Sequence, residues 1–222
     1  RFAIRTPIVL SMPRVVTDLR VTPDGETVLF GDTDGTLWAV DLADPSQRRV
    51  LGRHPGVRYL SLSPDGRLLA TGGRTDVHVW DWLKGELVHT ISIPNWSYVA
   101  FSPDGRWLAT NGIETGLWDV RSWAPVVRFQ DPPSTGVFGR IVFSPGSELM
   151  AVLVTPDTIE LIDMDRLEPV AHLRCPTPIT TTAMDFTPDG SRLIVPDDHG
   201  HLLHTWDLRI LRRQLAEIGL DW

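Results

Sequence analysis

The sequence predicts an all-β protein built from repeated four-stranded antiparallel sheets and followed by a short C-terminal helix. Three observations predict this: a four-residue turn recurs, short apolar stretches flank every turn, and Trp-Asp pairs close several of the units. The 222-residue chain also has 18 Pro, 18 Gly and nine Trp, which favours short strands and many turns over long helices. This length fits one domain or one repeat array.

The recurring turn has the sequence Ser/Thr-Pro-Asp-Gly. Pro presets φ at the second position, Asp tolerates the third, and Gly supplies the fourth. The five copies lie 39 to 43 residues apart and begin at Thr22, Ser63, Ser102, Ser144 and Thr187, with Asp24, Gly25, Asp65, Gly66, Asp104, Gly105, Asp189 and Gly190 as the defining residues. The fourth copy has lost Asp and moved its Gly to 146, so we expect that turn to differ in type. A nearly constant period indicates one repeated structural unit.

Each unit offers four candidate strands. The first lies before the turn, at 15–21, 57–62, 98–101, 139–143 and 182–186. The second follows the turn, at 27–30, 68–71, 107–110, 149–154 and 192–195. The third ends in an apolar residue and Asp, at Val40-Asp41, Trp80-Asp81, Trp118-Asp119, Ile162-Asp163 and Trp206-Asp207. A fourth strand is readable at 48–51, 87–93, 126–129 and 170–173, so each unit is predicted to be an antiparallel meander.

These residues carry a resemblance to a known family. The unit that runs from Tyr98 to Gly112, YVAFSPDGRWLATNG, and closes at Trp118-Asp119 resembles the WD40 repeat. The resemblance implies a β-propeller, in which stacking sheets around an axis buries the two apolar faces of each sheet. The Gly-His pair that usually precedes the first strand is displaced, and Gly52-Arg53-His54 is its nearest match. The resemblance therefore implies that the family's Trp-Ser/Thr-His-Asp hydrogen-bond network is incomplete.

The number of blades is open at this point. WD40 propellers most often have seven blades, whereas this chain has five units and opens at Arg1 without a Met. Residues 7–12 look like the last strand of a blade, either of a preceding blade or closing a five-bladed ring. We prefer a fragment of a larger, seven-bladed ring. The expected domains are a propeller at 1–207, in which 1–12 end a preceding blade or close the ring, and a capping helix and tail at 208–222.

The C-terminal residues 208–218 read LRILRRQLAEI, with apolar residues at 208, 211, 215 and 218, which is helical spacing. The helix is interpreted as a cap on the last blade, with a docking helix or a linker as the alternative. The ending resembles the tail after the propeller in large multidomain bacterial WD-repeat proteins, some of which carry an upstream Ser/Thr kinase domain. Kinase motifs are absent from these residues. The resemblance thus implies a targeting or regulatory part of a larger bacterial signalling protein, with any kinase domain outside this chain.

Composition narrows the partners and the location. The net charge of −7 and the pI of about 5.4 leave no basic face for phosphates, so we expect no nucleic-acid partner. Cys175 is the only cysteine, which excludes an internal disulfide and favours a reducing compartment. The longest apolar run, near 149–154, is too short to span a bilayer, and no signal peptide is visible. A cytoplasmic protein without a membrane partner is predicted.

One segment of the sequence has the residue types of a metal site. The most metal-like cluster comprises Asp197, Asp198, His199, His201 and His204. These residues occupy repeat positions, because Asp198-His199-Gly200 corresponds to the turn Thr33-Asp34-Gly35 of the first unit. A structural role is therefore favoured over metal binding. G-x-S-x-G, H-E-x-x-H and C-x-x-C are all missing. We therefore expect no cofactor, no metal and no enzymatic activity.

Binding residues are predicted at a position whose residue type varies among the five repeats while the surrounding repeat pattern stays the same. The residue four before each Ser/Thr is Asp18, Tyr59, Tyr98, Arg140 or Ala183. The resemblance places the strand starts on the rim that usually binds partners, and Tyr and Arg are typical interface anchors. Tyr59, Tyr98 and Arg140 at this position, and Arg58 next to it, are therefore predicted to bind a protein or peptide, with a merely solvated rim as the alternative. Trp96 is assigned to the core.

Two rival interpretations remain. A propeller-based hydrolase would need His, Asp or Glu from several inner strands to converge on the central channel, but the inner strands carry mainly apolar residues, Thr and Ser. A propeller with periplasmic-type Pro-Asp-Gly repeats shares the turn. The three Trp-Asp closures favour WD40, and a non-catalytic protein-interaction scaffold is the leading prediction.

Overall fold

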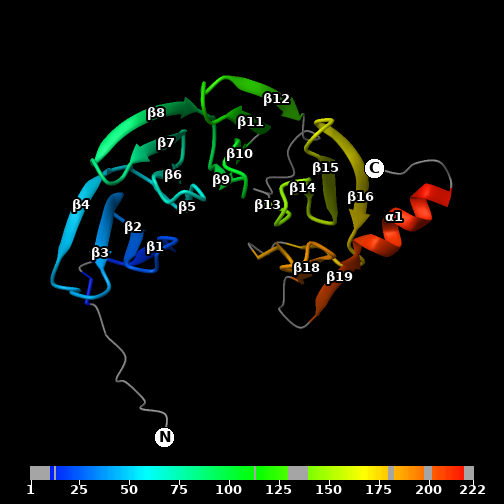
Figure 1. Ribbon diagram of the computed structural model, residues 1–222, viewed down its shortest axis with the longest axis horizontal. Coiled ribbons are helices and arrows are strands. Elements are labelled where there is room, and N and C mark those ends of the chain that lie inside the picture. The colour runs from blue at the N-terminus through cyan, green and yellow to red at the C-terminus, as the bar shows by residue number, and fades with distance from the viewer. Residues whose placement is uncertain are drawn as a thin grey trace, which may run out of the picture.

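The computed structural model describes residues 11–12, 14–112, 114–129, 140–179, 183–197 and 202–217. In these ranges the chain forms five antiparallel sheets and a C-terminal helix, α1, at Leu208–Glu217. Figure 1 shows the sheets arranged one after another around an open arc, with α1 on the outer side of the arc near β16 and β19. The all-β prediction is thereby confirmed.

The strand bounds follow the repeat. The first sheet contains β1 (Val16–Val21), β2 (Thr27–Asp32), β3 (Thr36–Asp41) and β4 (Arg48–Arg53). The second contains β5 (Tyr59–Leu62), β6 (Leu68–Gly72), β7 (Asp76–Asp81) and β8 (Glu86–Ser92). The third contains β9 (Tyr98–Phe101), β10 (Trp107–Asn111), β11 (Thr115–Asp119) and β12 (Pro125–Phe129). The fourth contains β13 (Ile141–Phe143), β14 (Leu149–Thr155), β15 (Thr158–Asp163) and β16 (Glu168–Arg174), and the fifth β17 (Asp185–Phe186), β18 (Arg192–Pro196) and β19 (Leu203–Asp207).

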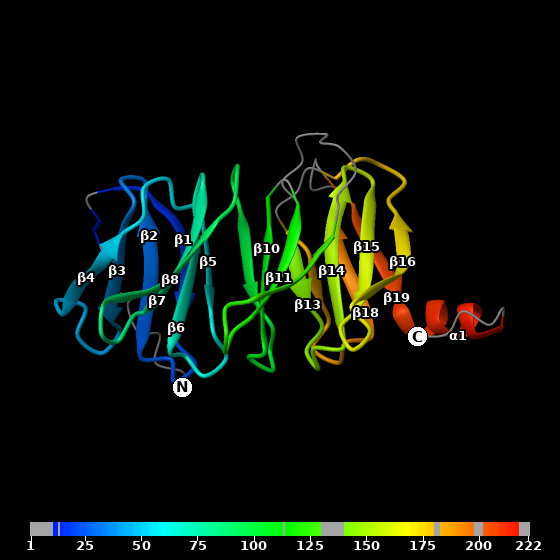
Figure 2. The same ribbon diagram turned by 90° about the horizontal axis from the view of Figure 1, so that it is seen from above.

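Every sheet is a meander in which consecutive strands pair. The first strands, β1, β5, β9, β13 and β17, lie on the inside of the arc, and each contacts the first strand of the next sheet. The fourth strands, β4, β8, β12 and β16, lie on the outside. Figure 2 shows the strands running between two rims of loops, so that equivalent loops of all sheets gather on the same rim.

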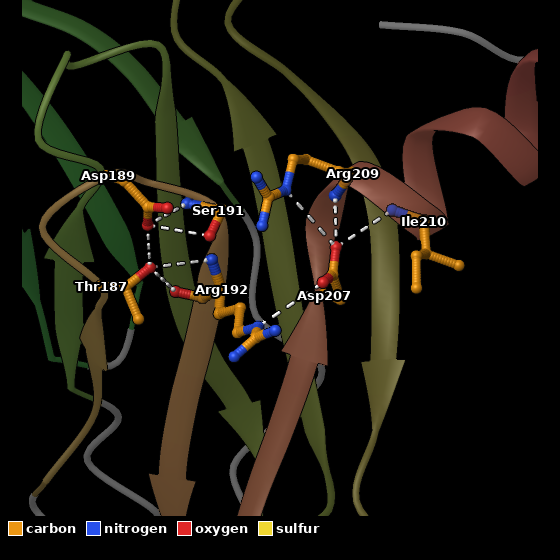
Figure 3. Close-up of polar contacts among 7 residues, drawn as sticks. All are labelled: Thr187, Asp189, Ser191, Arg192, Asp207, Arg209 and Ile210. Carbon is orange, nitrogen blue, oxygen red and sulfur yellow. Dashed lines mark hydrogen bonds and ion pairs between the residues drawn. The ribbon is translucent and has the colours of Figure 1, made fainter.

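The Thr187 turn illustrates how the repeat sequence specifies its structure (Figure 3). The Thr187 hydroxyl donates to the Asp189 carboxylate at 2.6 Å and accepts the Arg192 N–H at 3.0 Å. Gly190 has a φ of 68° and its N–H donates to the Thr187 carbonyl, which closes the turn. Hydrogen bonds from Thr187 and Ser191 hold the pKa of Asp189 well below its usual value. Equivalent turns at Thr22, Ser63 and Ser102 share this arrangement.

The fourth turn was predicted to differ in type, and this prediction is wrong. The Ser147 N–H donates to the Ser144 carbonyl as the glycines do, and Ser147 itself adopts a φ of 67°. A left-handed backbone is costly for a residue with a side chain. Here the side chain gains a contact, because the Ser147 hydroxyl accepts the Asp104 N–H of the neighbouring turn at 3.0 Å.

The hydrophobic cores lie between successive sheets. Leu29 and Leu37 of the first sheet pack against Leu60 and Leu69 of the second, and all four are fully buried. The two ends of the arc differ from its interior. Leu19 is 50% exposed although its repeat equivalent Leu60 is 0% exposed, and Leu203 is 70% exposed although its equivalent Leu37 is 0% exposed. A self-closing ring of five sheets is therefore not what this structure shows.

The fifth sheet and α1 refine the sequence expectation. The described part of the fifth sheet has three strands rather than four, and α1 follows β19 directly. Asp207 caps the helix by accepting the N–H groups of Arg209 and Ile210 (Figure 3), as an N-cap aspartate does. Leu208 and Leu211 pack into the core between the fourth and fifth sheets. The proposed strand at 7–12 lies mostly outside the described residues, and the domain bounds stay a prediction.

In the described ranges, the helix is neither long nor apolar enough to cross a membrane.

Candidate partner-binding channel

A hollow of about 420 Å³ lies on the inside of the arc and is lined by residues of all five sheets. Its wall includes every residue that the sequence singled out for partner binding: Arg58, Tyr59, Tyr98 and Arg140. They lie at the starts of β5, β9 and β13, so they gather at one rim. The structure thus brings together four residues that are up to 82 positions apart in the sequence.

The repeat register explains why these side chains converge. Side chains alternate between the two faces of a strand, so the residues four and two positions before each Ser/Thr face the channel. The intervening residues, Leu60, Val99, Ile141 and Met184, are buried between the sheets. The second channel-facing position places Arg20 and Asp185 in the wall as well. Sequence reasoning missed these two, although the two-residue period pointed to them.

Aromatic rings and guanidinium groups dominate the mouth of the channel. The rings of Tyr59 and Tyr98 stack with centroids 3.7 Å apart and planes inclined by 22°. The Arg58 guanidinium lies 4.6 Å from the centroid of Trp96. Trp96 is half-buried and belongs to none of the hydrophobic clusters of the described residues, so its assignment to the core is wrong. Stacked rings and an arginine held on an aromatic face form a rigid surface at little entropic cost.

The Asp18 carboxylate in the channel wall is occupied by structural hydrogen bonds. One oxygen of Asp18 accepts from the Arg20 guanidinium and from the Leu19 N–H, each at 2.8 Å. The other oxygen accepts the Leu60 N–H at 2.8 Å and so ties the first sheet to the second. Similarly, the Ser61 hydroxyl accepts the Phe101 N–H at 2.9 Å and ties the second sheet to the third. These groups hold adjacent inner strands together, which favours a structural role over acid–base chemistry.

A second polar cluster lies in the second sheet. His54 Nε2 is 2.9 Å from an Asp76 oxygen, His54 Nδ1 is 2.7 Å from the Thr71 hydroxyl, and that hydroxyl accepts the Trp80 indole N–H at 3.0 Å. Because a carboxylate only accepts, Nε2 of a neutral His54 carries the proton. The expectation that this network is incomplete is therefore wrong for the second sheet. The sequence feature that could have predicted this network is Gly52-Arg53-His54, in which Arg53 separates the Gly and His that are adjacent in the family pattern.

The same cluster has the residue types of a metal site but not the geometry. His54, Asp76 and His78 place their donor atoms within 4.8 Å of one another. However, the two imidazoles stack with centroids 4.0 Å apart and planes inclined by only 17°, so their in-plane lone pairs run side by side. Histidines that share a zinc ion direct their lone pairs at the ion. Burial lowers the pKa of His54 against the opposing hydrogen bond to Asp76, and a hydrogen-bonded network explains the cluster best.

Two further candidates from the sequence have structural roles where they are described. Residues 198–201 lie outside the described part of the chain. Asp197 accepts the Leu202 N–H, and His204 Nε2 lies 3.2 Å from the Thr177 hydroxyl. Cys175 is buried, and burial raises the pKa of its thiol to about 11, which makes it a poor nucleophile.

Comparison with known proteins agrees with this architecture. Residues 45–81 match the family described as WD domain, G-beta repeat. This stretch spans β4 of the first sheet and β5 to β7 of the second, so the sequence repeat is offset from the sheet by one strand. No curated protein matches the chain in sequence.

Among solved structures, the chain is similar to the β-propeller domain of Cps50 (Swd1) from Myceliophteria thermophila. The TM-score is 0.73 at 19% sequence identity, and the match covers 89% of this chain and 66% of that domain. At this identity the likeness shows the fold, and the chain spans slightly less than two thirds of the propeller to which it is similar.

Proposed function

Because the chain has the fold of a WD40 β-propeller, we propose that it is a non-catalytic platform that binds a protein or peptide partner at the mouth of the inner channel. The observation that carries this proposal is the convergence of Arg58, Tyr59, Tyr98 and Arg140 on one hollow. The partner contacts the ring of Tyr59, which stacks on the buried Tyr98, through an apolar or aromatic side chain, and the two arginines through carboxylates or carbonyl oxygens. Typical interfaces place aromatic and Arg anchors in this way.

The hollow supports a peptide better than a small substrate. Several of its lining residues lie at the starts of β5, β9 and β13, next to the loops of one rim. Its carboxylate Asp18 is already bonded to Arg20 and to two backbone N–H groups. A hydrolase in this channel is the alternative, but it needs a carboxylate or imidazole free to exchange a proton with substrate. Asp18 is not such a group, so a hydrolase would depend on Asp185, the other carboxylate in the described channel wall, one oxygen of which accepts the Phe186 N–H.

The finer role follows from the tail and the charge. We place the platform in the cytoplasm, as the targeting or regulatory part of a larger bacterial signalling protein. The support is the resemblance of residues 208–222 to tails of bacterial multidomain WD-repeat proteins. Nucleic acid is not expected as a partner, since the net charge of −7 opposes phosphate binding.

Panning a displayed library of random peptides on the purified chain tests the proposal. Enriched peptides are measured by calorimetry against the wild type and against Arg58→Ala, Tyr59→Ala and Arg140→Ala. Each substitution is expected to weaken binding by about tenfold, the loss typical of an anchor. Arg121→Ala, in the exposed turn between β11 and β12, is the matched control and leaves affinity unchanged.

The competing outcomes are distinct. Peptides that bind the wild type and all three channel variants equally would place the interaction elsewhere and contradict the proposal. Release of product from chromogenic ester or phosphate substrates, abolished by Asp18→Asn or Asp185→Asn, would support the hydrolase instead.

A further inference from the structure

A second, smaller hollow of about 180 Å³ lies away from the channel, between the outer end of the second sheet and the third sheet. Ile93, Thr110, Glu114, Gly116, Trp118 and Arg128 are among the residues that line it. Arg128 and Glu114 stand at its mouth, where their charged groups are 3.8 Å apart and both side chains are about half exposed to solvent. The channel-binding proposal does not use this hollow.

Equivalent positions in the second and third sheets can be compared to find which side chain fills this space in the second sheet. In both sheets the Trp indole N–H donates to a buried Thr hydroxyl at 3.0 Å, through Trp80 and Thr71 or through Trp118 and Thr110. The preceding loops also match, since Gly56 and Asn95 adopt φ values of 77° and 80°. The strand register makes Thr71 equivalent to Thr110, His78 to Gly116 and Trp80 to Trp118. His54 and Ile93 are equivalent because each lies against a glycine, Gly73 or Gly112, and Asp76 and Glu114 are equivalent because their carbonyls accept the N–H groups of those glycines.

In the second sheet the equivalent space holds the ring of His78. That ring stacks on His54 at 4.0 Å and presents itself to Trp80 at 5.6 Å in an edge-on geometry. Its Nε2 lies 3.3 Å from the Asp76 carboxylate. In the third sheet Ile93 takes the place of His54 against the equivalent glycine, Gly112 instead of Gly73. Gly116 has no side chain, so the place of the second ring is left to the hollow.

We propose that this hollow binds the imidazole ring of a histidine from a partner polypeptide. The bound ring packs on Ile93 and on the indole of Trp118 and donates an N–H to the Glu114 carboxylate, a position that corresponds to His78 Nε2, 3.3 Å from Asp76. His78 in the second sheet also lies beside a Trp, a Thr and a carboxylate, whereas in the third sheet Ile93 replaces His54 and Arg128 replaces Thr90. A ring delivered from outside thus restores in the third sheet the packing that the chain itself supplies in the second.

The direct test titrates two capped tripeptides, acetyl-Gly-His-Gly-amide and acetyl-Gly-Phe-Gly-amide, into the ¹⁵N-labelled chain and follows the indole N–H signals by NMR. The histidine peptide is expected to shift the Trp118 signal in a saturable way, and the phenylalanine peptide is expected to leave it in place. Equal shifts with both peptides would mark a general apolar hole and overturn the proposal. No shift with either would also overturn it.

Matched variants assign the site. Gly116→His supplies the ring from within the chain and should abolish binding, provided that Thr110 and Trp118 move by a few tenths of an ångström to admit the new Cβ. Glu114→Gln, on an exposed side chain, should weaken binding by about tenfold because it removes a charged acceptor. His78→Gly opens the same space in the second sheet and should raise the stoichiometry from one site to two. Unchanged affinity in both Gly116→His and Glu114→Gln would contradict the assignment.

Discussion

The second and third sheets follow the same repeat, but different contacts stabilise the rim at which the second strand of each sheet ends and the third begins. In the second, Trp80, Thr71, His54 and Asp76 form a continuous buried hydrogen-bond chain. In the third, the chain stops at Trp118 and Thr110, because Ile93 stands where His54 would be. The fold survives the loss since the apolar contacts between sheets remain. The difference shows that apolar packing specifies the sheet, whereas the polar network is an addition that one sheet keeps and another replaces.

The largest expected difference comes from removing the central hydroxyl in each sheet. Thr71 and Thr110 are both buried. Thr71→Val leaves the Trp80 indole and His54 Nδ1 without a hydrogen-bond partner and should lower the free energy of unfolding by about 2 to 4 kcal/mol. Thr110→Val leaves only the Trp118 indole without a partner and should lower it by about 1 to 2 kcal/mol. Urea unfolding measures both. Equal losses would mean that the network adds nothing beyond one bond.

Transplanting the network into the third sheet sharpens the comparison. Ile93→His alone buries an imidazole without a well-placed carboxylate and should destabilise the chain by about 2 kcal/mol. Adding Glu114→Asp shortens the acceptor to the length found at Asp76 and should recover about 1 kcal/mol, seen as coupling in a double-mutant cycle. Strictly additive effects would show that the position is unsuited to the network.

The free energy of unfolding should depend on pH through His54 of the second sheet, whose equivalent in the third sheet, Ile93, does not titrate. Burial lowers the pKa of His54 below 6.5, so the unfolded chain takes up this proton at a higher pH than the folded chain does. Stability is therefore full above pH 6.5 and falls as the pH decreases towards the lowered value. One proton contributes at most about 1.4 kcal/mol for each pH unit.

The control for this prediction uses equivalent positions. His54→Gln should flatten the slope of unfolding free energy against pH in this range, and Ile93→Gln should leave the slope as in the wild type. The turn carboxyl Asp65, whose pKa the Ser63 hydroxyl lowers from 3.8, loses its contribution only in more acid solution. A slope that His54→Gln does not alter would assign the proton to another group.

The smallest effect, and the one expected to be the same in both sheets, concerns the turns. Asp65 and Asp104 each accept a Ser hydroxyl at 2.5 Å and a backbone N–H, at 3.1 and 3.0 Å respectively. Asp65→Ala and Asp104→Ala should each cost about 1 kcal/mol, as a net hydrogen bond does. If the two variants had clearly different unfolding temperatures, the contribution of the turn would also depend on the sheet in which it lies.

The sequence predicted most of the architecture because the turn chemistry is local. The Ser/Thr-Pro-Asp-Gly copies located β-hairpins in all five sheets, and the apolar spacing at 208, 211 and 215 predicted α1. The fourth turn escaped prediction, since the contact that supports the φ of Ser147 comes from Asp104, 43 residues away. The His54 network escaped for the same reason, because its members lie on a loop and three strand positions up to 26 residues apart.

The candidate sites were predicted unevenly. Tyr59, Tyr98 and Arg140 were found from one variable repeat position and Arg58 as its neighbour, and the structure collects all four around one hollow. Their role in binding stays a prediction. The smaller hollow at Gly116 could not be seen along the chain, because it arises from a side chain that is missing relative to His78. Only the strand register, which aligns the two positions, reveals it.

The central claim is that a partner binds at the channel mouth, and mapping a bound peptide on the surface tests it most directly. Amide NMR shifts would be followed while the tightest peptide from the displayed library is added to the wild-type chain. The account predicts that the largest shifts cluster at the starts of β5 and β9 and at Arg140, with little change along β12 and β16. A footprint confined to the outer strands, with the signals of Tyr59, Tyr98 and Arg140 unmoved, would contradict it.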